Sequence, residues 1–358
     1  SLPEVEPEEL GGAPAAVELL TPREGGPARY MYERLEDKVG AIESRLLAFA
    51  EALGEAMGEE SYPADPVAAA AGGQVRCVGR VVAEGDGRLV EGAAMLEGSV
   101  RHSGGGRAGL RLGALPSYAL FPGQAVAAEG LNPAGFALTA HRLVTGLPPP
   151  PYAPPPELEG AACAPCSVVC AAGPFSCASD LAYEPLKELL EYTRRRRPDA
   201  LFLLGPFVDA ESPAVRGGAL DCSFEAVFAS AVRDPLERLL AEEGCRTRVV
   251  LVPSTRDAAH CARVFPQPPL PEGLVEAAEG QVTMAPNPCV VRVGGAAVGA
   301  TTADVLRALS AAESARDAQG APKGDRMARL AGHLLGQRSW YPLHPPAPGA
   351  RARPPPPG

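Results

Sequence analysis

The pattern of apolar and polar positions changes along the chain, and each change marks a different kind of element. Over residues 30–60, apolar side chains recur every three or four positions and form one stripe of an amphipathic helix. The stripe consists of Leu35, Val39, Ile42, Leu46, Phe49, Leu53 and Met57. It is too short for the several heptads of a coiled coil, so we expect the helix to pack on its own domain.

Residues 62–147 show short β segments separated by turn signals such as Pro122-Gly123 and Asn132-Pro133. Asp86-Gly87 is a hairpin signal within the same stretch. The expected strands are Gln74–Ala83, Ala93–Val100, Leu110–Leu112, Gln124–Glu129 and Phe136–Val144. About five short strands suit a small barrel, for which the OB-fold is the natural candidate.

A proline-rich linker, residues 148–160, precedes a region in which strands and helices alternate. The expected strands are Cys166–Ala172, Ala200–Leu204, Arg248–Val252, Cys289–Val293 and Ala297–Thr301. The expected helices are Leu181–Arg195, Phe224–Glu243, Ala303–Ser314 and Arg326–Leu335. This alternation predicts an α/β layered domain over residues 161–346. We expect residues 1–29 to be a flexible N-terminal segment and residues 347–358 a disordered tail.

Composition narrows the function classes. The chain has 40 Gly and 40 Pro, and its 30 Arg far outnumber its 3 Lys. It has one Ile and only two Asn, Asn132 and Asn287. This skew is typical of GC-rich coding, so local runs of Pro or Arg carry less meaning than usual. The net charge of −10 argues against a protein whose main function is to bind nucleic acid. The sequence contains no apolar run of 18 residues, so no membrane span is expected.

Three loops that directly follow expected strands hold the candidate chemistry: Gly173–Ser176, Gly205–Asp209 and Pro253–Asp257. In an open α/β sheet, functional groups gather at the carboxyl ends of the strands. The spacing of the loops resembles the calcineurin-like metallophosphoesterases. That family places Asp-x-His, Gly-Asp-x-x-Asp and Gly-Asn-His-Asp (or Glu) motifs here, and these ligands hold two metal ions that activate a water.

The residues at the matching positions differ from that pattern. They are Gly173, Phe175, Pro206, Asp209, Thr255 and Arg256. Asp209 is the one of these that matches the family's ligand, and His344 alone could serve for the closing Gly-His-x-His motif. Apolar, hydroxyl and cationic groups cannot replace metal ligands. The resemblance therefore implies a phosphoesterase-like domain that is inactive and has no catalytic, metal-binding or cofactor-binding residues.

A phosphoesterase-like sequence with replaced metal ligands resembles the B (accessory) subunits of eukaryotic replicative DNA polymerases, and most of all the B subunit of DNA polymerase alpha. The similar strings are Gly173–Phe175, Tyr183–Leu186, Arg197–Asp199, Val252–Asp257, Val264–Pro269, Asn287–Cys289 and Gln337–Pro346, with Phe121–Gln124 and Glu129–Gly135 in the barrel. The resemblance covers roughly residues 30–346. It implies an α/β plus β architecture: an inactive calcineurin-like phosphoesterase domain with an OB-fold barrel and an N-terminal helix.

The resemblance also implies a function. The implied function is that of a non-catalytic accessory or scaffold subunit of the DNA polymerase alpha–primase complex, which acts in the initiation of DNA replication in the nucleus. The implied partner is the C-terminal region of the catalytic subunit, with the primase subunits reached through the complex. DNA contact is expected to be weak or indirect, and no membrane contact and no cofactor are expected.

Three alternatives remain open at this stage. The first is the B subunit of DNA polymerase delta or epsilon. The second is an OB-fold module that binds single-stranded DNA, although the only aromatic side chains of residues 72–146 are Tyr118, Phe121 and Phe136. The third is a weak metallophosphoesterase. It would use Asp209, Asp257, His260 and His344.

Two further motifs favour structural interpretations. Cys163, Cys166 and Cys170 suggest a zinc site, but no second pair follows at finger spacing. Cys166 and Cys170 fall on an expected buried strand, where Cys behaves as a small apolar residue. Arg194–Arg197 resembles a DNA-binding patch or nuclear signal, yet it stands at the end of an expected helix, where cations favour the helix dipole.

Overall fold

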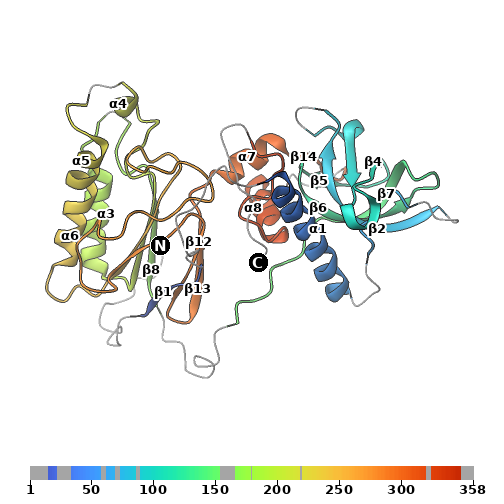
Figure 1. Cartoon of the computed structure of the whole chain (residues 1–358). Coiled ribbons are helices and arrows are strands. Elements are labelled where there is room, and N and C mark those ends of the chain that lie inside the picture. Colours follow the sequence, from blue (N-terminus) through green and yellow to red (C-terminus); the bar gives the residue numbers. More distant parts are fainter. Residues whose placement is uncertain are drawn as a thin grey trace. The chain divides into compact units, whose positions relative to one another are not determined.

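The computed structural model describes residues 15–21, 34–57, 62–68, 73–85, 89–153, 166–178, 180–217, 220–319 and 324–347. The chain forms two compact units (Figure 1). The layered unit comprises residues 1–28 and 151–303, and the barrel unit comprises residues 29–150 and 304–358. Each unit is therefore built from two separate stretches of the chain. Among the described residues, no helix has both the length and the apolar character needed to cross a membrane.

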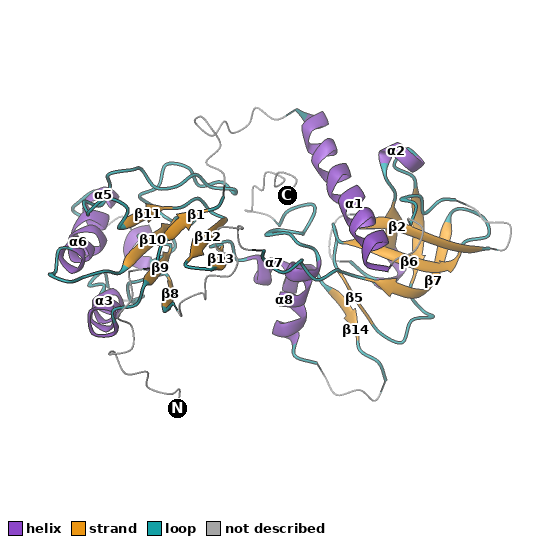
Figure 2. Ribbon diagram, turned by 90° about the horizontal axis from the view of Figure 1, so that it is seen from below, coloured by secondary structure: helices purple, strands orange, loops and turns teal. Residues whose placement is uncertain are grey.

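The layered unit contains two sheets. The parallel sheet has the order β11-β10-β9-β8 and the antiparallel sheet the order β1-β12-β13. Their strands are β8 (Val168–Ala172), β9 (Ala200–Leu204), β10 (Arg248–Val252), β11 (Val282–Met284), β1 (Val17–Leu19), β12 (Cys289–Val293) and β13 (Ala296–Ala300). The helices are α3 (Glu184–Arg196), α4 (Pro213–Arg216), α5 (Phe224–Phe228), the π-helix η4 (Ala229–Arg233) and α6 (Asp234–Leu240). Helices α3, α5 and α6 lie on the side of the parallel sheet away from β12 and β13 (Figure 2).

Strand β9 shows why the parallel sheet lies in the middle. Successive strand residues point to opposite faces. Leu201 and Leu203 join the core beneath the helices, whereas Ala200 and Phe202 join the core between the two sheets. All four are fully buried. Burial on both faces explains the continuous apolar run that identified this strand in the sequence.

The barrel unit contains a closed five-stranded barrel with the order β2-β3-β4-β7-β6. Its strands are β2 (Gln74–Ala83), β3 (Ala94–Glu97), β4 (Arg107–Arg111), β6 (Ala125–Leu131) and β7 (Ala137–Val144), joined by the short helices η2 (Glu91–Ala93) and α2 (Val100–Ser103). Strands β4 and β7 pair in parallel, and the remaining pairs are antiparallel. The predicted OB-fold barrel is thereby confirmed.

Two helical segments complete the barrel unit. Helix α1 (Leu35–Met57) packs Leu46, Phe49 and Leu53 against residues of β2 and β6 on the outside of the barrel. The later stretch contains α7 (Val305–Ala312), β14 (Ser314–Arg316) and α8 (Arg326–Gly336), and β14 pairs antiparallel with β5 (Tyr118–Leu120).

The later stretch corrects the expected domain boundary, because residues 304–346 group with the barrel and not with residues 161–303. Gln337 illustrates the attachment. It accepts a hydrogen bond from the Ala125 amide (2.9 Å) and donates to the carbonyl oxygens of Ala125 (2.8 Å) and Thr145 (2.9 Å). The alternation of strands and helices in a sequence predicts the elements but not the unit that each one joins.

Two other expectations were wrong. Residues 17–19 are not flexible: β1 pairs with β12, and Val17 and Leu19 pack against the core between the sheets. Cys170 is exposed and not buried, because β8 is the edge strand of the parallel sheet among the strands that the structure describes. The Asp86-Gly87 turn, Cys163, most of the proline-rich linker and residues 348–358 lie outside the described residues.

Candidate functional site

The three loops selected from the sequence do meet at the carboxyl ends of β8, β9 and β10. The Gly173 amide donates to the carbonyl oxygen of Leu204 (2.7 Å), and the Gly205 amide donates to that of Val252 (2.8 Å). Both glycines are needed for the close approach. A Cβ atom on Gly173 would overlap the Pro206 carbonyl, and one on Gly205 would overlap the Asp257 carboxylate.

Asp257 ties two of these loops together and is 2% exposed. Its Oδ1 accepts the amides of Phe207 and Val208 (3.2 Å for Val208), and its Oδ2 accepts the amide of Ser254 (2.7 Å). Burial raises the pKa of Asp257 to about 6, although the three amides and the nearby His260 favour the charged form. Asp257 therefore acts as a clamp on the main chain, as short acids often do in loops.

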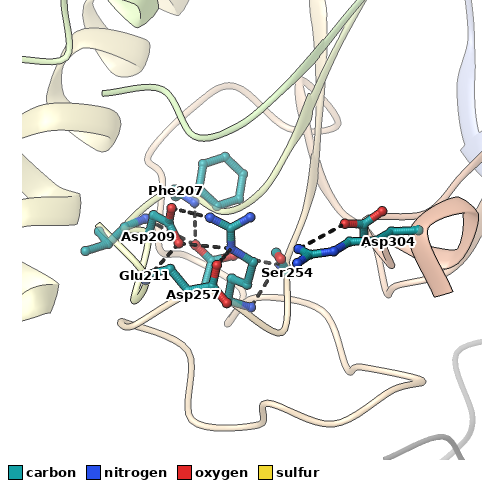
Figure 3. Close-up of polar contacts among 9 residues, drawn as sticks. Phe207, Asp209, Glu211, Ser254, Asp257 and Asp304 are labelled. Carbon is teal, nitrogen blue, oxygen red and sulfur yellow. Dashed lines mark hydrogen bonds and ion pairs between the residues drawn. The ribbon is translucent and has the colours of Figure 1, made fainter. Parts of the chain in front are cut away.

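Asp209 is bound by the guanidinium of Arg256 (Figure 3). Arg256 Nε donates to Asp209 Oδ1 (3.1 Å), and Nη2 donates to Oδ2. Asp209 is 6% exposed, and its Oδ1 also accepts the Glu211 amide (3.0 Å). A two-point guanidinium–carboxylate pair is a strong, charge-assisted interaction. The buried Asp209 carboxylate is thus neutralised by the Arg256 guanidinium.

The aromatic residues of the loops face the interior. Phe175 stacks on Phe207 with ring centroids 5.7 Å apart, and Phe207 makes an edge contact with Phe228 at the same distance. Tyr183 is 1% exposed and donates its hydroxyl to the Phe207 carbonyl (2.8 Å). Burial, aided by the charges of Asp257 and Asp209, raises the pKa of Tyr183 to about 12. These side chains fill the core and leave no aromatic surface for a substrate in these loops.

A neighbouring network around Asn287 supports the third loop. The main chains of Asn287 and Gln267 exchange hydrogen bonds (2.7 and 3.0 Å). The Asn287 side chain donates to Thr302 Oγ1 (2.6 Å) and accepts from Thr301 Oγ1 (3.0 Å). Thr302 Oγ1 in turn donates to the Pro253 carbonyl (2.8 Å). Both Asn287 and Gln267 are buried.

The sequence did not assign a role to Asn287 or Gln267, although one signal was present. Asn is rare in this chain, and both Asn side chains make hydrogen bonds in buried positions. Asn132 is likewise fully buried, donates to the Pro66 carbonyl (2.8 Å) and accepts the Gly135 amide (2.8 Å).

The four residues of the weak metallophosphoesterase alternative are not brought together as a ligand set. The buried His260 lies beside Gln267 and contacts the main chain of Ala262 (3.0 Å). His344 belongs to the barrel unit, where its amide donates to the Pro122 carbonyl (3.0 Å). Within the described ranges, no three His, Cys, Asp or Glu side chains are grouped so that they could hold a metal ion.

Two other sequence motifs also have defined surroundings. Cys166 is half-buried and lies 3.7 Å from the Val293 carbonyl oxygen. In the Arg194–Arg197 run, Arg194 pairs with Glu191 (3.0 Å) and Glu242 (2.6 Å), and Arg196 lies over the ring of Tyr192. Arg197 ends α3 in a left-handed conformation.

Comparison with known proteins identifies relatives. A family model for the B subunit of DNA polymerases alpha and epsilon matches residues 168–353, and a model for the OB domain of the DNA polymerase alpha B subunit matches residues 41–146. The chain is 33% identical over 342 residues to the DNA polymerase alpha B subunit of Bos taurus, covering 94% of this chain and 54% of the relative.

Other relatives carry the same name. The chain is 33% identical over 340 residues to the DNA polymerase alpha B subunit of Mus musculus, covering 94% of this chain and 55% of the relative. It is 31% identical over 277 residues to that of Schizosaccharomyces pombe, covering 75% and 47%. The chain thus spans about half the length of the curated relatives it matches. Because the first family model spans more than half of its residues, the chain belongs to the family of DNA polymerase alpha and epsilon B subunits.

Proposed function

We propose that this chain is a non-catalytic accessory and scaffold subunit of the DNA polymerase alpha–primase complex and acts in the initiation of DNA replication in the nucleus. The support is the order of two matches along one chain: an alpha-type OB domain, then the region common to the alpha and epsilon B subunits. The alpha-specific description of the OB match favours polymerase alpha over delta or epsilon.

The layered unit, in this proposal, is a phosphoesterase-like domain whose metal chemistry has been lost. The observation that carries this step is the pairing of Asp209 with Arg256. A metal ion at Asp209 would have to displace a guanidinium that already neutralises the carboxylate through two hydrogen bonds. Asp257 accepts main-chain amides on both carboxylate oxygens in a buried position, so a metal ion would have to compete with these hydrogen bonds.

The partner in this proposal is the C-terminal region of the polymerase alpha catalytic subunit, and primase is reached through the complex. Loops that need not admit a substrate can be stiff and closed. The strand-end loops have these properties, since Phe175 and Phe207 fill the core and the loop amides are bound by Asp257. A rigid surface loses little conformational entropy on binding, which suits a scaffold.

A direct test of the lost chemistry is an assay for phosphodiesterase and phosphatase activity with Mn²⁺, Mg²⁺ or Zn²⁺. The wild-type chain and the Asp209→Asn variant should show the same background rate, because a dinuclear site needs several anionic or imidazole ligands. Metal-dependent turnover that disappears in Asp209→Asn would refute the loss of catalysis.

The single-stranded DNA-binding alternative receives less support from the barrel. Phe121 is buried and contacts the ring of His333, and Tyr118 lies beneath the guanidinium of Arg316. Of the three aromatic residues noted in the sequence, Phe136 is the exposed one, at 69%. One exposed ring is a poor platform for stacking successive bases.

A further inference from the structure

The apolar stripe of α1 is longer than the surface that covers it. In its second half, Leu46 and Leu53 are buried against the barrel. In its first half, Leu35 is 77% exposed and Val39 is 43% exposed. The stripe is therefore continuous in the sequence but covered over only part of its length by the residues that the structure describes.

The uncovered half forms one wall of a groove of about 470 Å³ in the barrel unit. The lining residues are Leu35, Glu36, Val39, Gly40, Glu43, Val100 and Arg101, so α2 forms the opposite wall. Val100 is 56% exposed. The Glu43 carboxylate accepts the amides of Val100 (2.9 Å) and Arg101 (3.2 Å), which fixes α2 against α1. The groove is therefore held open by hydrogen bonds and exists before any partner arrives.

Among the residues that line this groove, Gly40 is a glycine at a position where neither the backbone conformation nor close packing within the chain requires one. It lies inside a 23-residue helix and is absent from the glycines with positive φ. A Cβ atom at this position would meet nothing within 4 Å. Glycine inside a helix is destabilising relative to alanine, and one of its common uses is to let another backbone approach closely. Gly40 deepens the groove where such an approach would occur.

We propose that this groove is a docking site for an amphipathic α-helix of a protein partner. Leu35 and Val39 lie one helical turn apart, at the i, i+4 spacing with which a helix presents apolar side chains to a facing helix. The charged groups in the lining are Glu36, Glu43 and Arg101, which leaves the groove acidic overall. The partner helix should therefore place two or three large apolar side chains in the groove and a Lys or Arg beside Glu36.

This inference rests on the proposed function, which supplies the partner: the helix belongs to the C-terminal region of the polymerase alpha catalytic subunit. The experiment measures the affinity of the full chain for that region by calorimetry, alongside the melting temperature of the chain alone. The variants are Gly40→Gln, which fills the groove with a good helix former, and Val39→Asp, which charges its wall. The control is Met327→Asp on α8, where the side chain is 56% exposed and outside the groove.

The melting temperature and the affinity should respond differently to the groove variants. Gly40→Gln should melt at or above the wild-type temperature, because helix propensity improves and the added Cβ atom meets nothing within 4 Å. The same variant should bind roughly tenfold more weakly or worse, as expected for a change at the centre of an interface. Val39→Asp should weaken binding similarly, whereas Met327→Asp should stay within about twofold of wild type.

Other outcomes would overturn the inference. Binding within about twofold of wild type for both groove variants would reject the groove and leave the proposed function standing. A lower melting temperature for Gly40→Gln would mean that another segment of this chain fills the groove. Loss of a self-associated state in Gly40→Gln would identify a second copy as the occupant. If the wild-type chain did not bind the catalytic subunit at all, the proposed function and this inference would fall together.

Discussion

At the scale of single residues, a few buried polar side chains hold the strand ends by serving several main-chain groups each. Asp257 accepts three amides, and Asn287 connects two threonine hydroxyls. A buried polar group that loses a partner costs far more than a typical surface contact contributes. The stability of the layered unit should therefore be sensitive at these positions.

Asp257 makes the stability dependent on pH. Its pKa is raised to about 6 in the folded chain, from an ordinary value of 3.8. An acid whose folded pKa is raised contributes stability that is fully present below its unfolded pKa and is lost as the pH rises through its folded pKa. Between pH 5 and pH 7, we expect this group alone to lower the free energy of unfolding by about 1 kcal/mol.

The measurement is urea unfolding of the wild type and the Asp257→Asn variant at both pH values. The variant should be less stable at each pH by about 1–3 kcal/mol, because its amide NH₂ cannot accept a main-chain hydrogen bond. It should also lack the part of the pH dependence that Asp257 contributes. Equal pH dependence in the two proteins would show that this carboxylate does not titrate in the range.

In the barrel unit, Gln337 is a buried polar side chain that likewise serves several main-chain groups, and it is 5% exposed. Gln337→Leu would leave the Ala125 amide, the Arg45 guanidinium and two carbonyl oxygens with fewer partners. We expect a loss of roughly 2–4 kcal/mol in the free energy of unfolding. The matched control is Gln74→Leu at an exposed position of β2, which should change stability by less than about 0.5 kcal/mol. Equal effects at both positions would contradict the role given to Gln337.

At the scale of elements, the sequence predicted best those segments whose burial comes from their own pattern. The boundaries of β2, β9, β10 and β12 agree with the expected strands. The three-residue strands β1, β5, β11 and β14 were not expected, because each depends on a partner far away in the chain. Periodicity within three residues is too short to carry a signal.

The candidate site was also predictable from the sequence only in part. The position of the three loops was predictable, because strands of a parallel sheet end at one edge. The pairing of Asp209 with Arg256 was not, since it depends on how two loops from different strands fold over each other. His344, which the sequence suggested only for the weak metallophosphoesterase alternative, lies in the barrel unit.

Deletion of residues 304–358 tests that reassignment. We expect the barrel to lose the buried contacts of Gln337 and the β5–β14 pairing, while the core of the layered unit is retained. Hydrogen exchange should then rise in β2 and β6 and stay unchanged in β9 and β10. Faster exchange in β9 and β10 but not in the barrel would place residues 304–346 with the layered unit instead.

At the scale of the whole molecule, charge is divided unequally between the two units. The layered unit has 25 acidic and 14 basic residues, a net charge of −11, whereas the barrel unit, with 18 acidic and 19 basic residues, has a net charge of +1. An acidic unit repels phosphate at long range, and a nearly neutral barrel attracts it little.

We therefore expect weak intrinsic binding of single-stranded DNA, with a Kd no tighter than about 10⁻⁶ M at physiological salt. Fluorescence anisotropy with a labelled oligonucleotide over a salt series measures it. Tighter binding that is lost when exposed barrel arginines such as Arg101 and Arg111 are changed to Ala would instead support a DNA-binding module.

The scaffold role is tested most directly by the association of the full chain with the C-terminal region of the polymerase alpha catalytic subunit. We expect the two polypeptides to co-purify as a stable one-to-one complex through size-exclusion chromatography. Cross-links should map to the barrel unit as well as to the layered unit. No association at micromolar concentrations, with both polypeptides folded, would contradict it.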